Sequence, residues 1–340
     1  MIWLAWRQQR VALLVLGGYV LLLTFLMTYY RATMLAVVDA QGLGPCVVSH
    51  YESGCLPNLT PTVWGWYETA DNIRMALIGY GVLVGVFLGA PLFAREFEQH
   101  THLLALTQSA RPSRWFTAKV AVVVVPAALG ALLLGALFRW WTAALGKLLV
   151  PREGFHAALF EPQPPALFGY AVFAVGLGAV VGLAVRRVVP AMALTLVGWL
   201  AALYGVRRFV RMHYMSPVVV ERPFDDDLAG YRADEDRWRL DDGVVDATGR
   251  FISDRDEVVR EASRSCEISS YGSHTPAYED CMTALGYRSG ADLVQPGDRF
   301  WWFQGIESAL FTGAGVLCVL GAMWWLHRRF RRELRVPAAT

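Results

Sequence analysis

Six stretches of the chain are apolar over the length that a helix needs to cross a lipid bilayer. A hydrocarbon core of ~30 Å requires about 20 apolar residues in a helix. The stretches that meet this requirement are residues 11–30, 75–94, 116–138, 166–185, 188–206 and 300–326. The first is too long for the apolar region of a signal peptide. The pattern predicts an all-α polytopic membrane protein with six transmembrane helices.

Basic residues indicate how these helices are oriented. If the chain starts inside, the cytoplasm receives arginine clusters near both termini, in segment 95–119 and at 186–187. Cytoplasmic connections usually carry the excess of basic residues. We therefore expect both termini inside, although Arg207, Arg208 and Arg211 then fall on the outer side.

The predicted spans divide the chain into seven regions. These are an amphipathic start with the first helix (1–30), an outer loop (31–74), helices two and three (75–138) with a cytoplasmic segment (95–119), a second outer loop (139–165), helices four and five (166–206), an extracytoplasmic domain (207–299), and helix six with a basic tail (300–340). Most of the 29 acidic residues lie in region 207–299. Its scattered aromatic residues predict a small folded domain.

Composition supports a membrane protein of bacterial origin. The chain is 55% hydrophobic with a mean hydropathy of +0.36, and Lys119 and Lys147 are its only lysines. This exceeds the apolar content of ordinary soluble domains. The Ala, Val, Leu, Gly and Arg bias suggests a high-GC bacterium, so we expect the plasma membrane.

Four of the five cysteines fall on the predicted outer side. Cys46, Cys55, Cys266 and Cys281 lie in polar segments, whereas Cys318 lies inside a span. An oxidising compartment permits disulfides. We expect local pairs, Cys46 with Cys55 and Cys266 with Cys281, because short loops close most easily. These would staple the outer domain; four unrelated thiols are the alternative.

Segment 95–119 has features of a partner-binding element. Its first part, residues 95–107, is polar with apolar residues at helical spacing, and Pro112 follows. A short exposed helix of this kind suits docking to a cytoplasmic protein. A solvated connecting loop is an equally open interpretation.

The whole chain resembles membrane subunits of the ABC type-2 exporter superfamily, and more narrowly the actinobacterial permeases that open with Trp-Arg-Gln. The matching motifs are MIWLAWRQQR (1–10), GAPLFAREFEQHTHLLALTQSARPSRWFTAK (89–119), RMHYMSP (211–217) and PGDRFWWFQGIE (296–307). The second and fourth motifs are specific, whereas the first alone is weak.

The resemblance implies a homodimeric pore powered by two copies of a separate ATPase, which would bind the ATP and Mg²⁺. Residues 95–107 would be the coupling helix, with Arg95, Glu96, Phe97, Glu98 and Thr101 matching the family pattern. His100 departs from it, because relatives usually have glycine there.

No sequence signature of catalysis or cofactor binding occurs in the chain. It has no GxxxxGK[ST] phosphate loop, HExxH zinc motif or nucleophile elbow. His100 and His102 near Glu96 form a weak metal candidate, and we expect solvation instead. The expected protein is non-catalytic, binds lipids but no nucleic acid, and holds no cofactor or metal.

Two further patterns concern the spans themselves. Gly81, Gly85 and Gly89 repeat every four residues and predict a close helix-packing face, within one subunit or between two. Gln304 and Glu307 lie near the outer end of the sixth span, where an ionisable group is a functional candidate. We hypothesise that Glu307 pairs with Arg207, Arg208 or Arg211, and a partly hydrated carboxylate at the membrane surface is an equally open interpretation.

The leading interpretation is an ATP-driven exporter permease for a hydrophobic or amphipathic substrate, such as a lipid, peptide or antibiotic. A mechanotransmission device and a membrane-anchored sensor are the alternatives. An ion-coupled carrier is disfavoured, because the span centres lack acidic residues and histidines.

Overall fold

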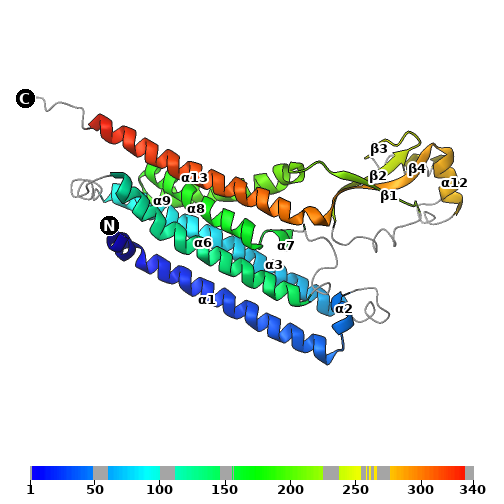
Figure 1. The fold of residues 1–340 in the computed structure, drawn as a ribbon, viewed down its shortest axis with the longest axis horizontal. Coiled ribbons are helices and arrows are strands. Elements are labelled where there is room, and N and C mark those ends of the chain that lie inside the picture. Colours follow the sequence, from blue (N-terminus) through cyan, green and yellow to red (C-terminus); the bar gives the residue numbers. More distant parts are fainter. Residues whose placement is uncertain are drawn as a thin grey trace, which may run out of the picture.

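Long helices packed side by side form most of the described chain (Figure 1). The computed structural model describes residues 2–48, 60–99, 112–145, 155, 157–224, 237–253, 258, 260–261, 264–265 and 276–333. The main helices are α1 (Ile2–Ala40), α3 (Thr60–Leu83), α4 (Pro91–Glu98), α6 (Pro112–Leu145), α8 (Pro164–Val185), α9 (Val188–Gly205) and α13 (Phe300–Glu333). Shorter helices are α2 (Gly44–Val48), α7 (Ala157–Phe160) and α12 (Pro276–Ala284).

Within these residues, six helical stretches are long and apolar enough to cross a membrane. They are Trp6–Ala40, Gly65–Glu98, Arg114–Leu145, Pro164–Val185, Val188–His213 and Gly297–Arg328. The predicted six spans are thereby confirmed, although several helices extend beyond the apolar runs. The start of α1 and the end of α13 lie at the same end of the bundle (Figure 1). Which side of the membrane that end faces stays a prediction.

Helix α8 occupies the centre of the bundle. It is apolar all round and buried along most of its length, as expected for a helix surrounded by others. It packs against α13, α6, α9 and the second span. Glycines allow the close approach: a Cβ added at Gly169 would lie 2.9 Å from the carbonyl oxygen of Ser308 on α13.

Proline interrupts the second span near its C-terminal end. Pro91 has no N–H to donate, and its ring conflicts with the carbonyl of the residue four positions earlier. The helix widens there into the π-helix η1 (Val84–Gly89), and Ala90 N–H donates to the carbonyl of Gly85 at 2.8 Å. Helix α4 then continues the span from Pro91.

The region predicted to be extracytoplasmic, which we call the outer domain, contains a β-sheet, so the expectation of an all-α protein is wrong there. Strands β1 (Val218–Arg222), β2 (Trp238–Asp246), β3 (Phe251–Ile252) and β4 (Tyr287–Gln295) form one antiparallel sheet in the order β1-β4-β2-β3. Charged residues interrupt the apolar alternation of β2 and β4, which hides these strands in the sequence. Val244, Val258 and Met282 form the small core beside the sheet.

The expected disulfides fall partly outside the described residues. Cys46 and Cys281 are disulfide-bonded, whereas Cys318 is a free thiol. No bridge joins two of the cysteines that the structure describes. Cys55 and Cys266 lie outside those residues, so the proposed pairing stays a prediction.

Candidate functional site

A buried ion pair joins α13 to the end of the fifth span. Glu307 is fully buried and Arg211 is only 2% exposed. The guanidinium donates twice to the carboxylate, from Nε to Oε2 at 2.8 Å and from Nη2 to Oε1 at 2.7 Å. This bidentate geometry suits arginine and carboxylate. Of the three arginines hypothesised as partners of Glu307, the structure selects Arg211.

Two tyrosines complete the coordination of the Glu307 carboxylate. The Tyr170 hydroxyl donates to Oε1, and the Tyr214 hydroxyl donates to Oε2 at 3.2 Å. Burial and then the charge of Glu307 raise the pKa of Tyr214, which lies just beyond the fifth span. The Tyr214 hydroxyl therefore stays protonated and available as a donor. Glu307 is thus held by groups from α8, from the end of the fifth span and from the segment after it.

A second buried carboxylate, Glu161, extends this cluster toward the second span. It is 1% exposed in the turn between α7 and α8. Arg74 Nη1 on α3 donates to Glu161 Oε2 at 2.9 Å, and Arg74 Nε donates to Asp71 at 2.8 Å. Arg211 Nη2 lies 3.7 Å from Glu161 Oε1. We call Arg74, Glu161, Tyr170, Arg211, Tyr214 and Glu307 the outer charge cluster, after the side of the membrane on which it is predicted to lie.

Glu161 could not be predicted from the sequence as part of this cluster. It is a single acidic residue in the run Leu-Phe-Glu-Pro-Gln-Pro-Pro, and nothing in the charge pattern separates it from an exposed loop residue. Its position between apolar residues and three prolines is the only available signal. Gln304, by contrast, is one of the residues that the sequence singles out. Its side chain accepts a hydrogen bond from the Ala166 N–H in the first turn of α8, at 3.2 Å, and donates one to the Phe160 carbonyl, at 2.7 Å.

A change of helix geometry turns Arg211 inward. The π-helix η3 (Val206–Val210) follows α9, and the 3₁₀ turn η4 (Arg211–His213) follows η3. The wider turn shifts the register, so Arg207 and Arg208 remain exposed while Arg211 enters the bundle. A regular helix would have placed Arg207 and Arg211 on the same face.

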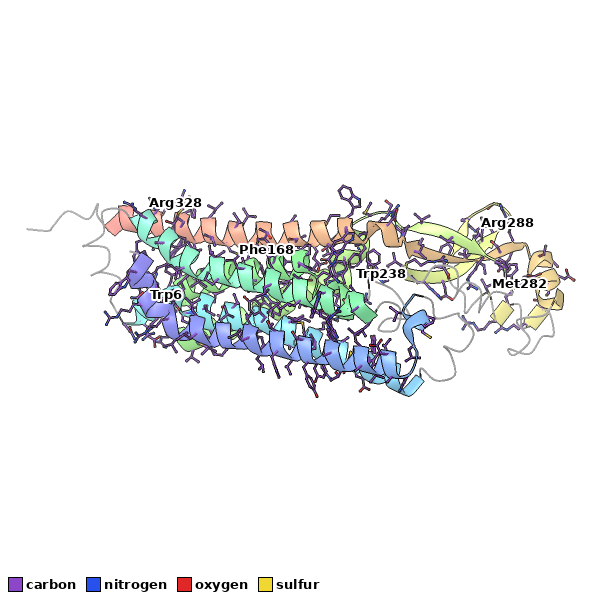
Figure 2. All side chains as sticks on the ribbon, turned by 60° about the horizontal axis from the view of Figure 1, so that its bottom comes forward. Trp6, Phe168, Trp238, Met282, Arg288 and Arg328 are labelled. Atoms are coloured by element: carbon purple, nitrogen blue, oxygen red, sulfur yellow. The ribbon has the colours of Figure 1, made fainter. Side chains whose placement is uncertain are left out.

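Aromatic rings join the bundle to the sheet directly beside this cluster. Trp238, the first residue of β2, stacks on Phe155 with ring centres 5.7 Å apart and approaches Phe303 of α13 at 6.3 Å. Figure 2 shows Trp238 at the end of the bundle that faces the sheet. The Arg211 guanidinium lies 4.3 Å from the ring centre of Phe160. We call Phe155, Phe160, Trp238, Phe300 and Phe303 the aromatic junction.

At the opposite end of the bundle, Glu96 forms a second buried ion pair. Glu96 is 6% exposed and pairs with Lys119 of α6, which is 4% exposed. Gln8 of α1 also donates to Glu96, at 3.4 Å. The pair therefore joins the helix that precedes residues 99–111 to the helix that follows them.

This arrangement changes the picture of the predicted coupling segment. Arg95 and Glu98 are exposed at the end of α4, as a docking surface requires, but the Glu96 carboxylate points inward. Glu98 accepts from Val188 N–H at 2.9 Å and so caps the start of α9. Phe97 is partly buried against the core. Thr101 and His100 lie outside the described residues, so docking itself stays a prediction.

The predicted glycine face packs inside the subunit. A Cβ at Gly85 would lie 3.1 Å from the carbonyl oxygen of Ala174, and one at Gly89 would lie 3.2 Å from Gly178 Cα, both on α8. A Cβ at Gly81 would lie 2.5 Å from the Trp199 ring on α9. The second span thus packs closely on α8 and α9.

Nothing in the described part of the chain groups three or more metal-binding side chains. The outer charge cluster pairs its cations and carboxylates with each other and lies beside the aromatic junction. Such a cluster can fix the relative positions of helices.

The sequence profile of the ABC-2 membrane transporter related family matches residues 17–211. No curated protein and no solved structure matches the chain in comparable searches. The matched segment covers more than half of the 340 residues, from α1 to Arg211 of the outer charge cluster. The chain therefore belongs to the ABC-2 membrane transporter related family.

Proposed function

We propose that this protein is the transmembrane subunit of an ATP-driven exporter in a bacterial plasma membrane. The observation that carries the proposal is the family match across the first five of the six membrane helices. The subunit would act as a homodimer with two copies of a cytoplasmic ATPase, which would bind ATP and Mg²⁺. Its cargo would be hydrophobic or amphipathic.

The buried pair Glu96–Lys119 gives this proposal a mechanical basis. Helix α4 precedes residues 99–111 and α6 follows them, and the ion pair links the two helices. Force applied to this segment by an ATPase would therefore reach α4 and α6 together. Gln8 would carry the movement to α1. Rigid helices linked in this way transmit a displacement over their length.

The test is affinity purification of the tagged protein from its native membrane in mild detergent, followed by an assay of ATP hydrolysis. We expect an ATPase to co-purify. The variant Thr101→Arg, in the predicted docking segment, should reduce the recovered ATPase activity at least several-fold. Thr283→Arg, on the exposed face of α12 in the outer domain, should leave it unchanged. Glu96 is unsuitable for this test, because its replacement would also disturb a buried ion pair.

Reproducible purification without any ATPase would refute the exporter proposal. Equal losses of ATPase with Thr101→Arg and Thr283→Arg would refute the role of the docking segment.

A mechanotransmission device is the second candidate, and the aromatic junction favours it. Helix η4 leads into β1 within a few residues, and β4 leads into α13 through η5 (Gly297–Arg299). Arg299 donates to the Ser216 carbonyl at 2.7 Å, which ties these two connections together. Movement of α9 and α13 would therefore move the sheet. ATP-driven change in Trp238 accessibility without any cargo uptake into proteoliposomes would support this candidate over the exporter.

A further inference from the structure

A cavity opens on the side of the bundle near the end where α1 begins. Its volume is about 740 Å³, and its walls come from α1, the second span and the start of α9. Ligand pockets typically have volumes of roughly 300–1,000 Å³. The cavity is therefore large enough for a small amphiphile or a substantial part of a lipid.

The lining changes character along the cavity. Gln9, Arg95 and Glu98 lie at the ends of their spans, whereas Val11, Val15 and Phe87 lie closer to the middle of theirs. Val15 lies roughly 9 Å along α1 from Gln9, at 1.5 Å per residue. Val11, Val15 and Phe87 are each at least half exposed. The cavity thus offers a polar mouth at the membrane surface and an apolar wall at the depth of acyl chains.

The mouth carries one cation and one carboxylate that are not paired with each other. Arg95 is exposed and has no ion-pair partner among the described residues. Glu98 is exposed too, and its Oε2 accepts from Val188 N–H while Oε1 remains available. Arg95 and Glu98 carry opposite charges, so the mouth is neutral overall. They lie one turn apart on α4, so the mouth has a positive and a negative side.

The π-helix η1 forms part of the cavity wall. Pro91 forces the wider turn, and Phe87 and Leu88 of η1 line the cavity immediately before it. A π-helical turn inside an α-helix frequently marks a functional site.

We propose that this cavity binds a zwitterionic amphiphile that carries a phosphate and a primary ammonium group, as an aminophospholipid does. Arg95 binds the phosphate, Glu98 accepts hydrogen bonds from the ammonium group, and Gln9 contributes a neutral amide. An acyl chain lies against Val11, Val15 and Phe87. The identification of this amphiphile as the transported cargo rests on the proposed function, whereas its binding does not.

Binding is tested on the purified full chain, delipidated in detergent, by native mass spectrometry with lysophosphatidylethanolamine. We expect one bound molecule per chain. Arg95→Gln and Glu98→Gln should each weaken binding about tenfold, since each removes a charge-assisted hydrogen bond. Lysophosphatidylglycerol of the same chain length, which lacks the ammonium group, should bind about tenfold more weakly.

Two matched controls separate the cavity from the general lipid surface. Val15→Trp fills the apolar wall and should abolish binding, whereas Leu14→Trp, on the same helix but outside the lining, should not. Arg10→Gln removes an exposed charge outside the lining and should also leave binding unchanged. Equal binding of the two lysolipids, or equal effects of Val15→Trp and Leu14→Trp, would overturn the proposal.

A second measurement separates this inference from the proposed function. In the purified complex with the ATPase, lysophosphatidylethanolamine should stimulate ATP hydrolysis, and Val15→Trp should remove the stimulation. Stimulation that persists in Val15→Trp would overturn the role of this cavity in cargo binding while the exporter function stands. If lysophosphatidylethanolamine binds the chain as expected but no ATPase ever co-purifies with it from the native membrane, the binding site stands and the exporter function is refuted.

Discussion

Replacing either partner of the Arg211–Glu307 pair should destabilise the protein strongly. Both side chains are almost completely buried, and Glu307 accepts four hydrogen bonds from three residues. Removing one partner of a buried pair leaves the other charge uncompensated, which costs about 3–5 kcal/mol. We expect Arg211→Met and Glu307→Met each to lower the free energy of unfolding by this amount.

The corresponding shift in the thermal midpoint follows from the size of the protein. An unfolding entropy of about 2.1 cal/mol/K per residue gives roughly 0.7 kcal/mol/K for 340 residues. A loss of 3–5 kcal/mol then lowers the midpoint by about 4–7 °C. Membrane helices keep their backbone hydrogen bonds when packing is lost, so the real entropy is smaller and the shift at least this large. Tryptophan fluorescence of the detergent-solubilised protein during heating measures it.

The double variant provides the decisive comparison. Arg211→Met with Glu307→Met removes both charges, so its cost should be well below the sum of the two single costs. The double variant still leaves the hydroxyls of Tyr170 and Tyr214 without their acceptor. Each unsatisfied hydroxyl lowers the free energy of unfolding by about 1–3 kcal/mol. Arg208→Met, at the exposed neighbouring position, should change stability by less than about 0.5 kcal/mol. Additive single costs, within about 0.5 kcal/mol, would refute the assigned pairing.

Three other predictions concern separate parts of the molecule. Gly178→Ala should destabilise the bundle by about 1–3 kcal/mol, because the added Cβ would lie 2.6 Å from Ala90 N. A Cβ added at Gly17 meets nothing within 4 Å, so Gly17→Ala is the matched control, and only Gly178→Ala should lower the thermal midpoint. Lys119→Met should cost about 3–5 kcal/mol, because Glu96 loses its buried counter-charge, and an unchanged melting curve would contradict this. Hydrogen bonds from Thr248 and from the Arg250 amide lower the pKa of Asp246, so its contribution is present at neutral pH and is lost as pH falls below about 4. Once the intrinsic exchange rate at each pH is divided out, the protection of amides at the β2–β3 turn should fall over that range, and Asp246→Asn should remove this fall.

The membrane helices were predictable because their signal is long and redundant. An apolar run of about 20 residues survives several polar substitutions, so all six spans could be found. Their ends could not, because the terminal turns are polar or aromatic and resemble loops in sequence. At α1 a single charge had the same effect: Arg31 interrupts the apolar run that ends at Tyr30, although the helix continues to Ala40.

The outer charge cluster was predictable only in part. Glu307 and its set of candidate arginines stood out, because ionisable residues are rare near membrane spans. The choice of Arg211 depended on the π-helical turn at residues 206–210, which no propensity rule predicts. Glu96 was placed on a docking surface by resemblance, but its inward position depends on Lys119, 23 residues away in the chain. Both cases involve contacts that exist only after the helices have packed.

The pairing of β1 with β4 has a consequence for how the protein can evolve. These are the first and last strands of the outer domain, and they are hydrogen-bonded neighbours from Val218↔Val294 to Arg222↔Gly290. The domain therefore leaves the bundle and returns to it at almost the same point, as inserted domains commonly do. The family match ends at Arg211, a few residues before this insertion begins. Such a domain can be exchanged, enlarged or lost between related proteins without changing the route of the helices, provided that Arg211 still meets Glu307.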